Sequence, residues 1–227
     1  SPDGTKLFAS VNPFSPTGMR RVDPIPLRIL DPLTAELADT QLGGMPEGLT
    51  LYETFSISTD GRWLGAAFLH PKDLDDASHV RVWDMRRMSA PIASFTVPYL
   101  TSQLVISPDG TRIFVLGDGE VHALDLSSGR EVASAPVSDD GMLALTPDGK
   151  NLAVGRGTEV VLLDPQSLSV ATVLENEDVV GGRIVVSADG DMIAYAVNGT
   201  LIVRPLAHPQ SAGTQFPTGD QNDPRGI

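Results

Sequence analysis

The sequence contains no cysteine, and this absence removes several kinds of chemistry at once. Without thiols there is no disulfide framework, no thiolate nucleophile and no thiolate metal site, and redox chemistry gives no indication of the compartment. Cations are also scarce, because 16 Lys and Arg stand against 29 Asp and Glu, a net charge of −13. Such a chain repels a phosphate backbone or an anionic leaflet. We therefore expect no nucleic-acid partner and no membrane insertion, for which no apolar run is long enough.

Motifs of common catalytic and cofactor sites are missing too. The sequence has no Gly-x-Ser-x-Gly, His-Glu-x-x-His or Gly-Lys-Ser/Thr, and its four histidines are scattered. The glycine-rich stretches 117–119 and 155–157 do not precede a helical pattern, so they indicate hairpin turns rather than phosphate loops. We predict no catalytic residue, no metal and no cofactor.

A short motif, a hydroxyl residue followed by any residue (usually Pro), Asp and Gly, occurs five times, at 1–4, 58–61, 107–110, 146–149 and 187–190. Ser or Thr favours the first position of a type I turn, Pro presets φ at the second, and Gly accepts the positive φ that follows. Each copy is therefore predicted to be a tight turn between antiparallel strands. The structural residues of these turns are Asp3, Gly4, Asp60, Gly61, Asp109, Gly110, Asp148, Gly149, Asp189 and Gly190.

Short β-branched runs follow all five turns and precede all but the first, which is typical of strands. A third run ends on an acid at Asp31, Asp84, Asp125 and Asp164, and a Pro takes that place at 205. The distance from the turn Asp to this position is 16 in the last three copies, whereas about twelve and eight extra residues separate the second and third strands of the first two. A fourth run follows in each copy, for example at 36–42 and, weakly, at 213–216.

Four strands in roughly 40 to 45 residues is the period of a β-propeller blade. We predict an all-β propeller of four-stranded antiparallel blades with about five blades, at about 1–50, 51–100, 101–140, 141–180 and 181–206, and an irregular C-terminal segment or partial strand at 207–227. Many strands are apolar at consecutive positions, so both faces of each sheet are expected to be buried. Trp63 and Trp83 are interpreted as core residues of the second blade.

The motifs resemble those of the WD-repeat and YVTN-type propeller families. The resemblance rests on the Ser-Pro-Asp-Gly turns, on the stretch Val-Arg-Val-Trp-Asp at 80–84, and on Asp-Leu-Ser-Ser-Gly-Arg at 125–130. It covers nearly the whole chain and implies the fold but no particular activity. The chain lacks the Gly-His pair of WD repeats and has one Trp-Asp pair, which marks a divergent, bacterial-style member. The first copy begins at its turn, so we expect a fragment of a longer, larger ring rather than a closed five-bladed one.

The two inserted loops, 11–25 and 69–79, are expected on one rim, where long loops on a rigid scaffold commonly bind partners. The candidate partner-binding residues are Phe14, Arg20, Arg21, His70, Lys72, Asp73, Asp75 and Asp76. Two alternatives stay open. The loops could be surface excursions without a partner. Asp73, Asp75 and Asp76 with His79 could bind a metal, but we prefer a solvated acidic run, because a closing Glu is lacking.

The favoured function is a non-catalytic protein-interaction or sensor module within a larger signalling or regulatory protein. Its partner would be a protein or peptide, and a basic one if the rim is acidic. The alternatives are a propeller enzyme or enzyme-gating domain of the lactonase, quinoprotein or peptidase-associated kind, and a periplasmic assembly propeller. The compartment is open, with the cytoplasm favoured over the periplasm or the exterior.

Overall fold

The fold is all-β, as the sequence predicts. The computed structural model describes residues 1, 4–9, 28–34, 36, 42–44, 50–69, 77–137, 141–174, 180–197, 200–209, 211 and 213–217. Among these residues there are strands and turns but no helix, hence none that could cross a membrane. The strands are β1 (Leu7–Ala9), β2 (Arg28–Leu30), β3 (Thr50–Ile57), β4 (Trp63–Leu69), β5 (Ser78–Asp84), β6 (Ala93–Val97), β7 (Gln103–Ile106), β8 (Arg112–Gly117), β9 (Glu120–Asp125), β10 (Glu131–Pro136), β11 (Met142–Leu145), β12 (Leu152–Arg156), β13 (Glu159–Leu163), β14 (Val170–Leu174), β15 (Val180–Val186), β16 (Met192–Val197), β17 (Thr200–Pro205) and β18 (Thr214–Pro217).

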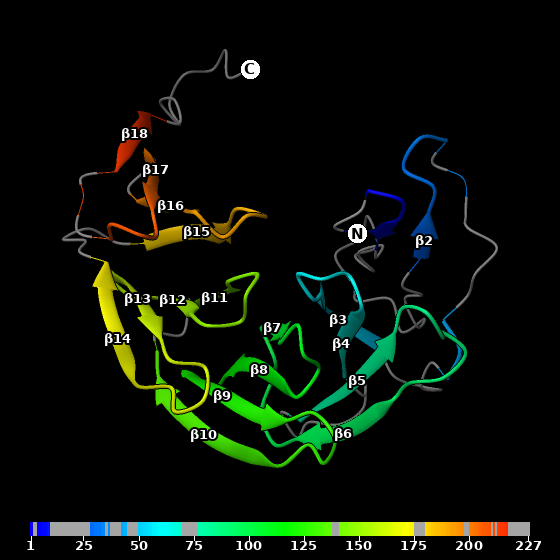
Figure 1. The fold of residues 1–227 in the computed structure, drawn as a ribbon. Coiled ribbons are helices and arrows are strands. Elements are labelled where there is room, and N and C mark those ends of the chain that lie inside the picture. Colours follow the sequence, from blue (N-terminus) through cyan, green and yellow to red (C-terminus); the bar gives the residue numbers. More distant parts are fainter. Residues whose placement is uncertain are drawn as a thin grey trace, which may run out of the picture. The chain divides into compact units, whose positions relative to one another are not determined.

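The strands form repeated sheets in chain order (Figure 1). Among the described residues, β3–β6, β7–β10, β11–β14 and β15–β18 are four-stranded sheets, and β1 pairs with β2 in a two-stranded one. The weak strand expected at 213–216 is β18, whose Thr214 pairs with Val203 of β17. The fourth strand expected in the first blade, at 36–42, lies mostly outside the described residues.

The chain divides into two compact units, and each is described by itself: residues 1–118 with 124–132, and residues 119–123 with 133–227. In the first unit, one apolar cluster joins the β1–β2 sheet to the β3–β6 sheet, and another joins β3–β6 to strands β7 and β8. In the second unit, one cluster joins β11–β14 to β15–β18. The core therefore consists of sheet faces packed on the next sheet, as expected for blades.

Burial follows the position of a strand within its sheet. In β4 the six residues 63–68 are all buried, and β8, β12 and β13 are nearly so, as the consecutive apolar runs predict. The expectation that both faces of every sheet are buried is wrong for β16, where Ile193, Tyr195 and Val197 are buried and the residues between them only partly so. The last strands β10 and β14 are largely exposed, whereas β7 and β11, at the opposite edges of the same sheets, have alternate residues buried.

All five repeated motifs form the same corner. The Gly N–H donates to the carbonyl of the hydroxyl residue three positions earlier at 2.8–2.9 Å, and the Gly φ lies between 68° and 79°. At the third corner, the Ser107 hydroxyl donates to the Asp109 carboxylate at 2.6 Å and accepts the Arg112 N–H at 2.9 Å. Ser58, Thr146 and Ser187 repeat both bonds. The hydroxyl therefore links the start of the corner to the start of the next strand; Asp3 lies outside the described residues.

The acids of the corners and of the third-strand ends are hydrogen-bonded as carboxylates. Hydrogen bonds from the Ser127 and Ser128 hydroxyls and the Ser128 N–H lower the pKa of Asp125 to about 2. The Thr146 hydroxyl and the Lys150 N–H lower the pKa of Asp148 to about 2. Asp125 and Asp148 thus stay ionised at neutral pH, where they hold turns rather than exchange protons.

A candidate partner-binding corner

The loop residues predicted to bind a partner, from Phe14 to Arg21 and from His70 to Asp76, all lie outside the described residues. Strand β4 runs from the 58–61 corner to Leu69, which precedes the second of these loops. The corner and that loop are therefore at opposite ends of one strand. It is at the corner end that the described residues gather a polar cluster.

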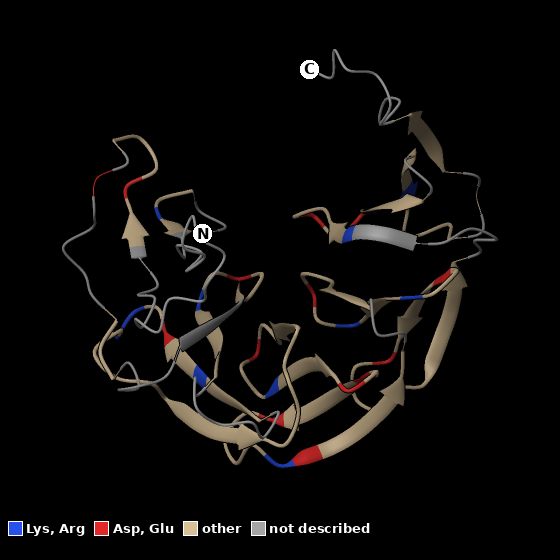
Figure 2. Ribbon diagram, turned by 180° about the vertical axis from the view of Figure 1, so that it is seen from behind, with Lys and Arg blue, Asp and Glu red and all other residues tan. Residues whose placement is uncertain are grey.

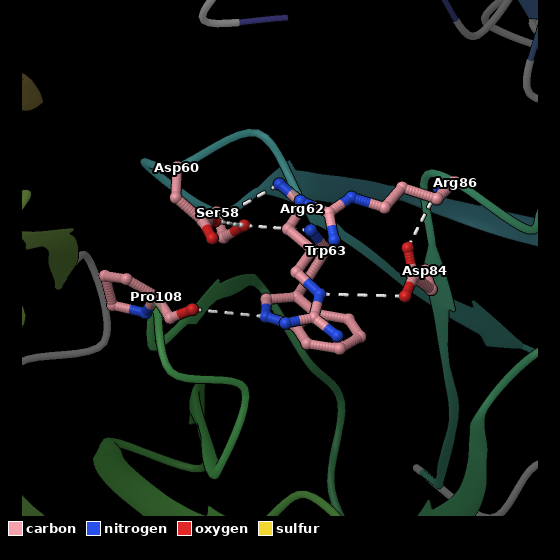
Figure 3. A network of polar contacts seen from close by, with 7 residues as sticks. All are labelled: Ser58, Asp60, Arg62, Trp63, Asp84, Arg86 and Pro108. Atoms are coloured by element: carbon pink, nitrogen blue, oxygen red, sulfur yellow. Dashed lines mark hydrogen bonds and ion pairs between the residues drawn. The ribbon is translucent and has the colours of Figure 1, made fainter.

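We call this cluster the Arg62 corner, and define it as Ser58, Asp60, Arg62, Trp63, Asp84 and Arg86 (Figure 3). The corner turn sets its geometry. The Asp60 carboxylate accepts the Ser58 hydroxyl at 2.5 Å and the Arg62 N–H at 3.1 Å. The Trp63 N–H donates to the Ser58 hydroxyl at 2.9 Å, which fixes the first residue of β4. The backbone that carries Arg62 and Trp63 is thus held before either side chain makes a contact.

The Arg62 side chain is held on two sides. Its Cζ lies 4.2 Å from the centroid of the Trp63 ring, a cation–π contact. Its Nε is buried and faces the Asp84 carboxylate, with Nε and Oδ2 3.6 Å apart. The Arg62 side chain is nevertheless 41% exposed, against 15% for Asp84. The contacts with Trp63 and Asp84 thus hold a side chain that is still partly open to solvent.

Trp63 braces the corner against the next blade. Its Nε1 donates to the Pro108 carbonyl at 3.3 Å, and its ring covers Gly110, where an added Cβ would lie 2.5 Å from Cζ2. Trp63 is buried, as predicted, but the interpretation of it as packing within its own blade is incomplete. It belongs to the cluster shared by two sheets.

Trp83 has the same bridging role on the other side of the blade. It is fully buried, its Nε1 donates to the Gly43 carbonyl at 2.8 Å, and its ring meets Phe68 edge-on. The Gly43 N–H in turn donates to the Met88 carbonyl at 2.8 Å. The second blade is therefore joined by a tryptophan N–H to the segment before it and to the corner after it, which gives the Arg62 corner a rigid base.

The corner holds two arginines and two aspartates in a chain that is acidic overall. Arg86 and Arg87 are both exposed and are separated from Asp84 by Met85, and the side chain of Arg86 points toward Arg62 (Figure 3). The Arg86 N–H donates to the Asp84 carboxylate at 2.9 Å. Many other charged residues lie at turns and strand ends (Figure 2). Within the corner, Arg62 and Arg86 balance Asp60 and Asp84, while the chain as a whole carries −13.

The remaining candidates from the sequence can be placed where the structure describes them. No group of three metal-ligating side chains occurs among the described residues, and Asp73, Asp75 and Asp76 lie outside them. The 155–157 stretch forms a hairpin, in which Arg156 pairs with Glu159 and Gly157 has φ 60°. Sequence reasoning missed the Arg62 corner, although a signal exists: the second copy alone has an Arg-Trp pair directly after its turn.

Comparison with known proteins identifies the fold. No family model and no curated protein sequence matches the chain. Among solved structures, the chain resembles the β-propeller domain of Cps50 (Swd1) from Myceliophteria thermophila, with a TM-score of 0.66 and 14% sequence identity over 95% of this chain and 70% of that chain. At this identity the likeness supports the β-propeller fold, and it says nothing further about activity.

Proposed function

We propose that the chain is a non-catalytic module of a larger regulatory protein, and that it binds a protein or peptide partner through the Arg62 corner. The observation that carries the proposal is an exposed arginine fixed between a buried tryptophan and a carboxylate. Arginine and tryptophan are the residue types enriched where a few side chains supply most of the binding energy of an interface. A propeller offers such a corner on a rigid scaffold, a placement favourable for recognition.

The fixed orientation of Arg62 lowers the cost of binding. A flexible arginine loses rotamer entropy when a partner immobilises it, by about 0.5–1.5 kcal/mol. The contacts with Trp63 and Asp84 already restrict this side chain in the free protein. The terminal N–H groups of Arg62 then donate to carbonyl or carboxylate oxygens of the partner. The net charge of −13 favours a partner that is basic overall, with one such acceptor at the contact.

Selection of peptides from a random twelve-residue display library on the immobilised chain provides a test with a defined probe. The enriched peptides are synthesised and titrated calorimetrically against the wild type and against Arg62→Ala. Loss of the anchor is expected to weaken binding about 5- to 30-fold, equivalent to about 1–2 kcal/mol. Because Arg62 is partly exposed, its removal leaves the blade folded, which far-UV circular dichroism checks.

Lys150→Ala is the matched control. Lys150 also follows a corner glycine, and its exposed side chain pairs with Asp148 of its own turn. Its removal is expected to leave peptide affinity unchanged. Peptides that bind Arg62→Ala as tightly as the wild type would place the binding surface elsewhere, and a library that yields no binding peptide would contradict the proposed function itself.

A further inference from the structure

Arg204 occupies a position that other blades give to a buried apolar side chain. Counted from the corner glycine, the fourteenth residue is Leu124 in the third copy, Leu163 in the fourth and Arg204 in the fifth. Trp83 holds the same place in the second copy, directly before the acid that ends the strand. The apolar residues at this position are 0–2% exposed, and Arg204 is only 7% exposed. An arginine therefore stands in a register position built for a hydrophobic residue.

The charge of Arg204 is largely uncompensated within the part of the chain that the structure describes. A guanidinium stays protonated at any pH at which the protein is folded, so burial cannot be relieved by loss of a proton. One Nη donates to the Pro209 carbonyl at 3.0 Å, and the Cζ lies 5.6 Å from the centroid of the Tyr195 ring. No carboxylate of the described residues forms an ion pair with it.

Two buried donors are left without an acceptor at the same place. Both the Nε of Arg204 and the hydroxyl of Tyr195 are enclosed and make no hydrogen bond. The two side chains share one face of the sheet, because Tyr195 pairs with Ile202 and Arg204 follows Ile202 by two residues. A single acceptor group between them would satisfy both. Buried polar groups in native proteins nearly always have such a partner.

We propose that Arg204 and Tyr195 bind a carboxylate group. One Nη already donates to the Pro209 carbonyl, whereas Nε has no acceptor. The edge of a guanidinium formed by Nε and a terminal nitrogen matches the two oxygens of a carboxylate. The Tyr195 hydroxyl supplies a further donor. The carboxylate comes from a small free acid or from an acidic residue of a bound peptide, which share this chemistry.

The test compares thermal unfolding in sodium acetate and in sodium chloride at equal ionic strength. Acetate is expected to raise the wild-type melting temperature by about 3 °C over chloride once its concentration exceeds the dissociation constant about tenfold. Arg204→Leu restores the side chain of the sibling blades, so this variant should fold and lose the acetate-specific rise. Tyr195→Phe should reduce the rise. Arg156→Leu removes a partly exposed arginine of the same unit and should keep it.

A ten-residue glutamate peptide distinguishes the two sources of the carboxylate. If the physiological ligand is a peptide, the glutamate peptide gives the same rise in melting temperature at a carboxylate concentration at least tenfold below that of acetate. If the ligand is a small acid, the peptide needs as high a carboxylate concentration as acetate does. Equal melting temperatures of the wild type in acetate and chloride, or a rise that persists in Arg204→Leu, would overturn the proposal. The site is in β17, far along the chain from the Arg62 corner, so either result leaves the peptide-binding test unaffected.

Discussion

Replacement of Trp83 by phenylalanine measures how firmly the second blade is joined to the segment before it. The substitution keeps an aromatic ring against Phe68, whose centroid lies 6.3 Å from that of Trp83, but removes the N–H that bonds the Gly43 carbonyl at 2.8 Å. Loss of that hydrogen bond costs about 1 kcal/mol. The missing second ring leaves a void in a site that is 0% exposed, at a further cost of about 1–2 kcal/mol, a fraction of the cost of full truncation.

The expected loss in the free energy of unfolding is therefore about 2–3 kcal/mol. Urea unfolding followed by far-UV circular dichroism measures it, and with a slope of about 2–3 kcal/mol/M the midpoint should fall by about 1 M. Trp63 remains as the single tryptophan of the variant, so its fluorescence gives a second record of the same transition.

Trp63→Phe is the matched comparison within the same blade. The Trp63 Nε1 lies farther from its acceptor, at 3.3 Å from the Pro108 carbonyl. Loss of this hydrogen bond should therefore cost about half as much free energy as loss of the one from Trp83. A Trp83→Phe midpoint within about 0.2 M of the wild type would refute the reasoning, because it would mean that the bond to Gly43 and the filled volume contribute little.

Two further predictions concern the corners. Gly110→Ala should lower the urea midpoint more than Gly157→Ala. Both glycines have positive φ, but only at Gly110 would the new Cβ contact the Trp63 ring. Equal losses in the free energy of unfolding, each about 1 kcal/mol, would show that the ring moves aside freely. The low pKa of Asp125 and Asp148, about 2 against the ordinary 3.8, stabilises the fold fully above about pH 4 and ceases to do so as the pH falls toward 2. Urea midpoints between pH 4 and pH 2 should therefore fall less steeply in the Asn variants of either residue than in the wild type, and parallel profiles would contradict this account.

The strands and corners could be predicted from the sequence because their causes are local. A Ser, an Asp and a Gly at fixed spacing form the corner bonds that Ser107 and Asp109 show, and β-branched runs on both sides can only be strands of the same sheet. β18 was weakly indicated, because Gly213 and Pro217 flank a short run, and it is nevertheless paired in register with β17.

The Arg62 corner could not be predicted in the same way, because its geometry depends on contacts between segments distant in sequence. The position of the Trp63 ring is set by Pro108 and Gly110 of the following blade, and no pattern around residue 63 contains that information. Arg204 is a different case. Alignment of the copies on their corner glycines places it beside Leu124 and Leu163, so the misfit is visible in the sequence. Its burial, and the lack of an ion pair with any described carboxylate, are properties of the folded sheet.

The corner completes its hydrogen bonds within a few residues of its own backbone, as the bonds from Ser107 to Asp109 and from Arg112 to Ser107 show. Because the corner fixes its own backbone conformation, it places few constraints on the rest of the repeat, which only needs apolar residues at strand positions. After duplication, the copies can accumulate substitutions independently without losing the ability to stack. In such proteins the common origin of the repeats is consequently still recognisable in the backbone structure after their sequence similarity has been lost.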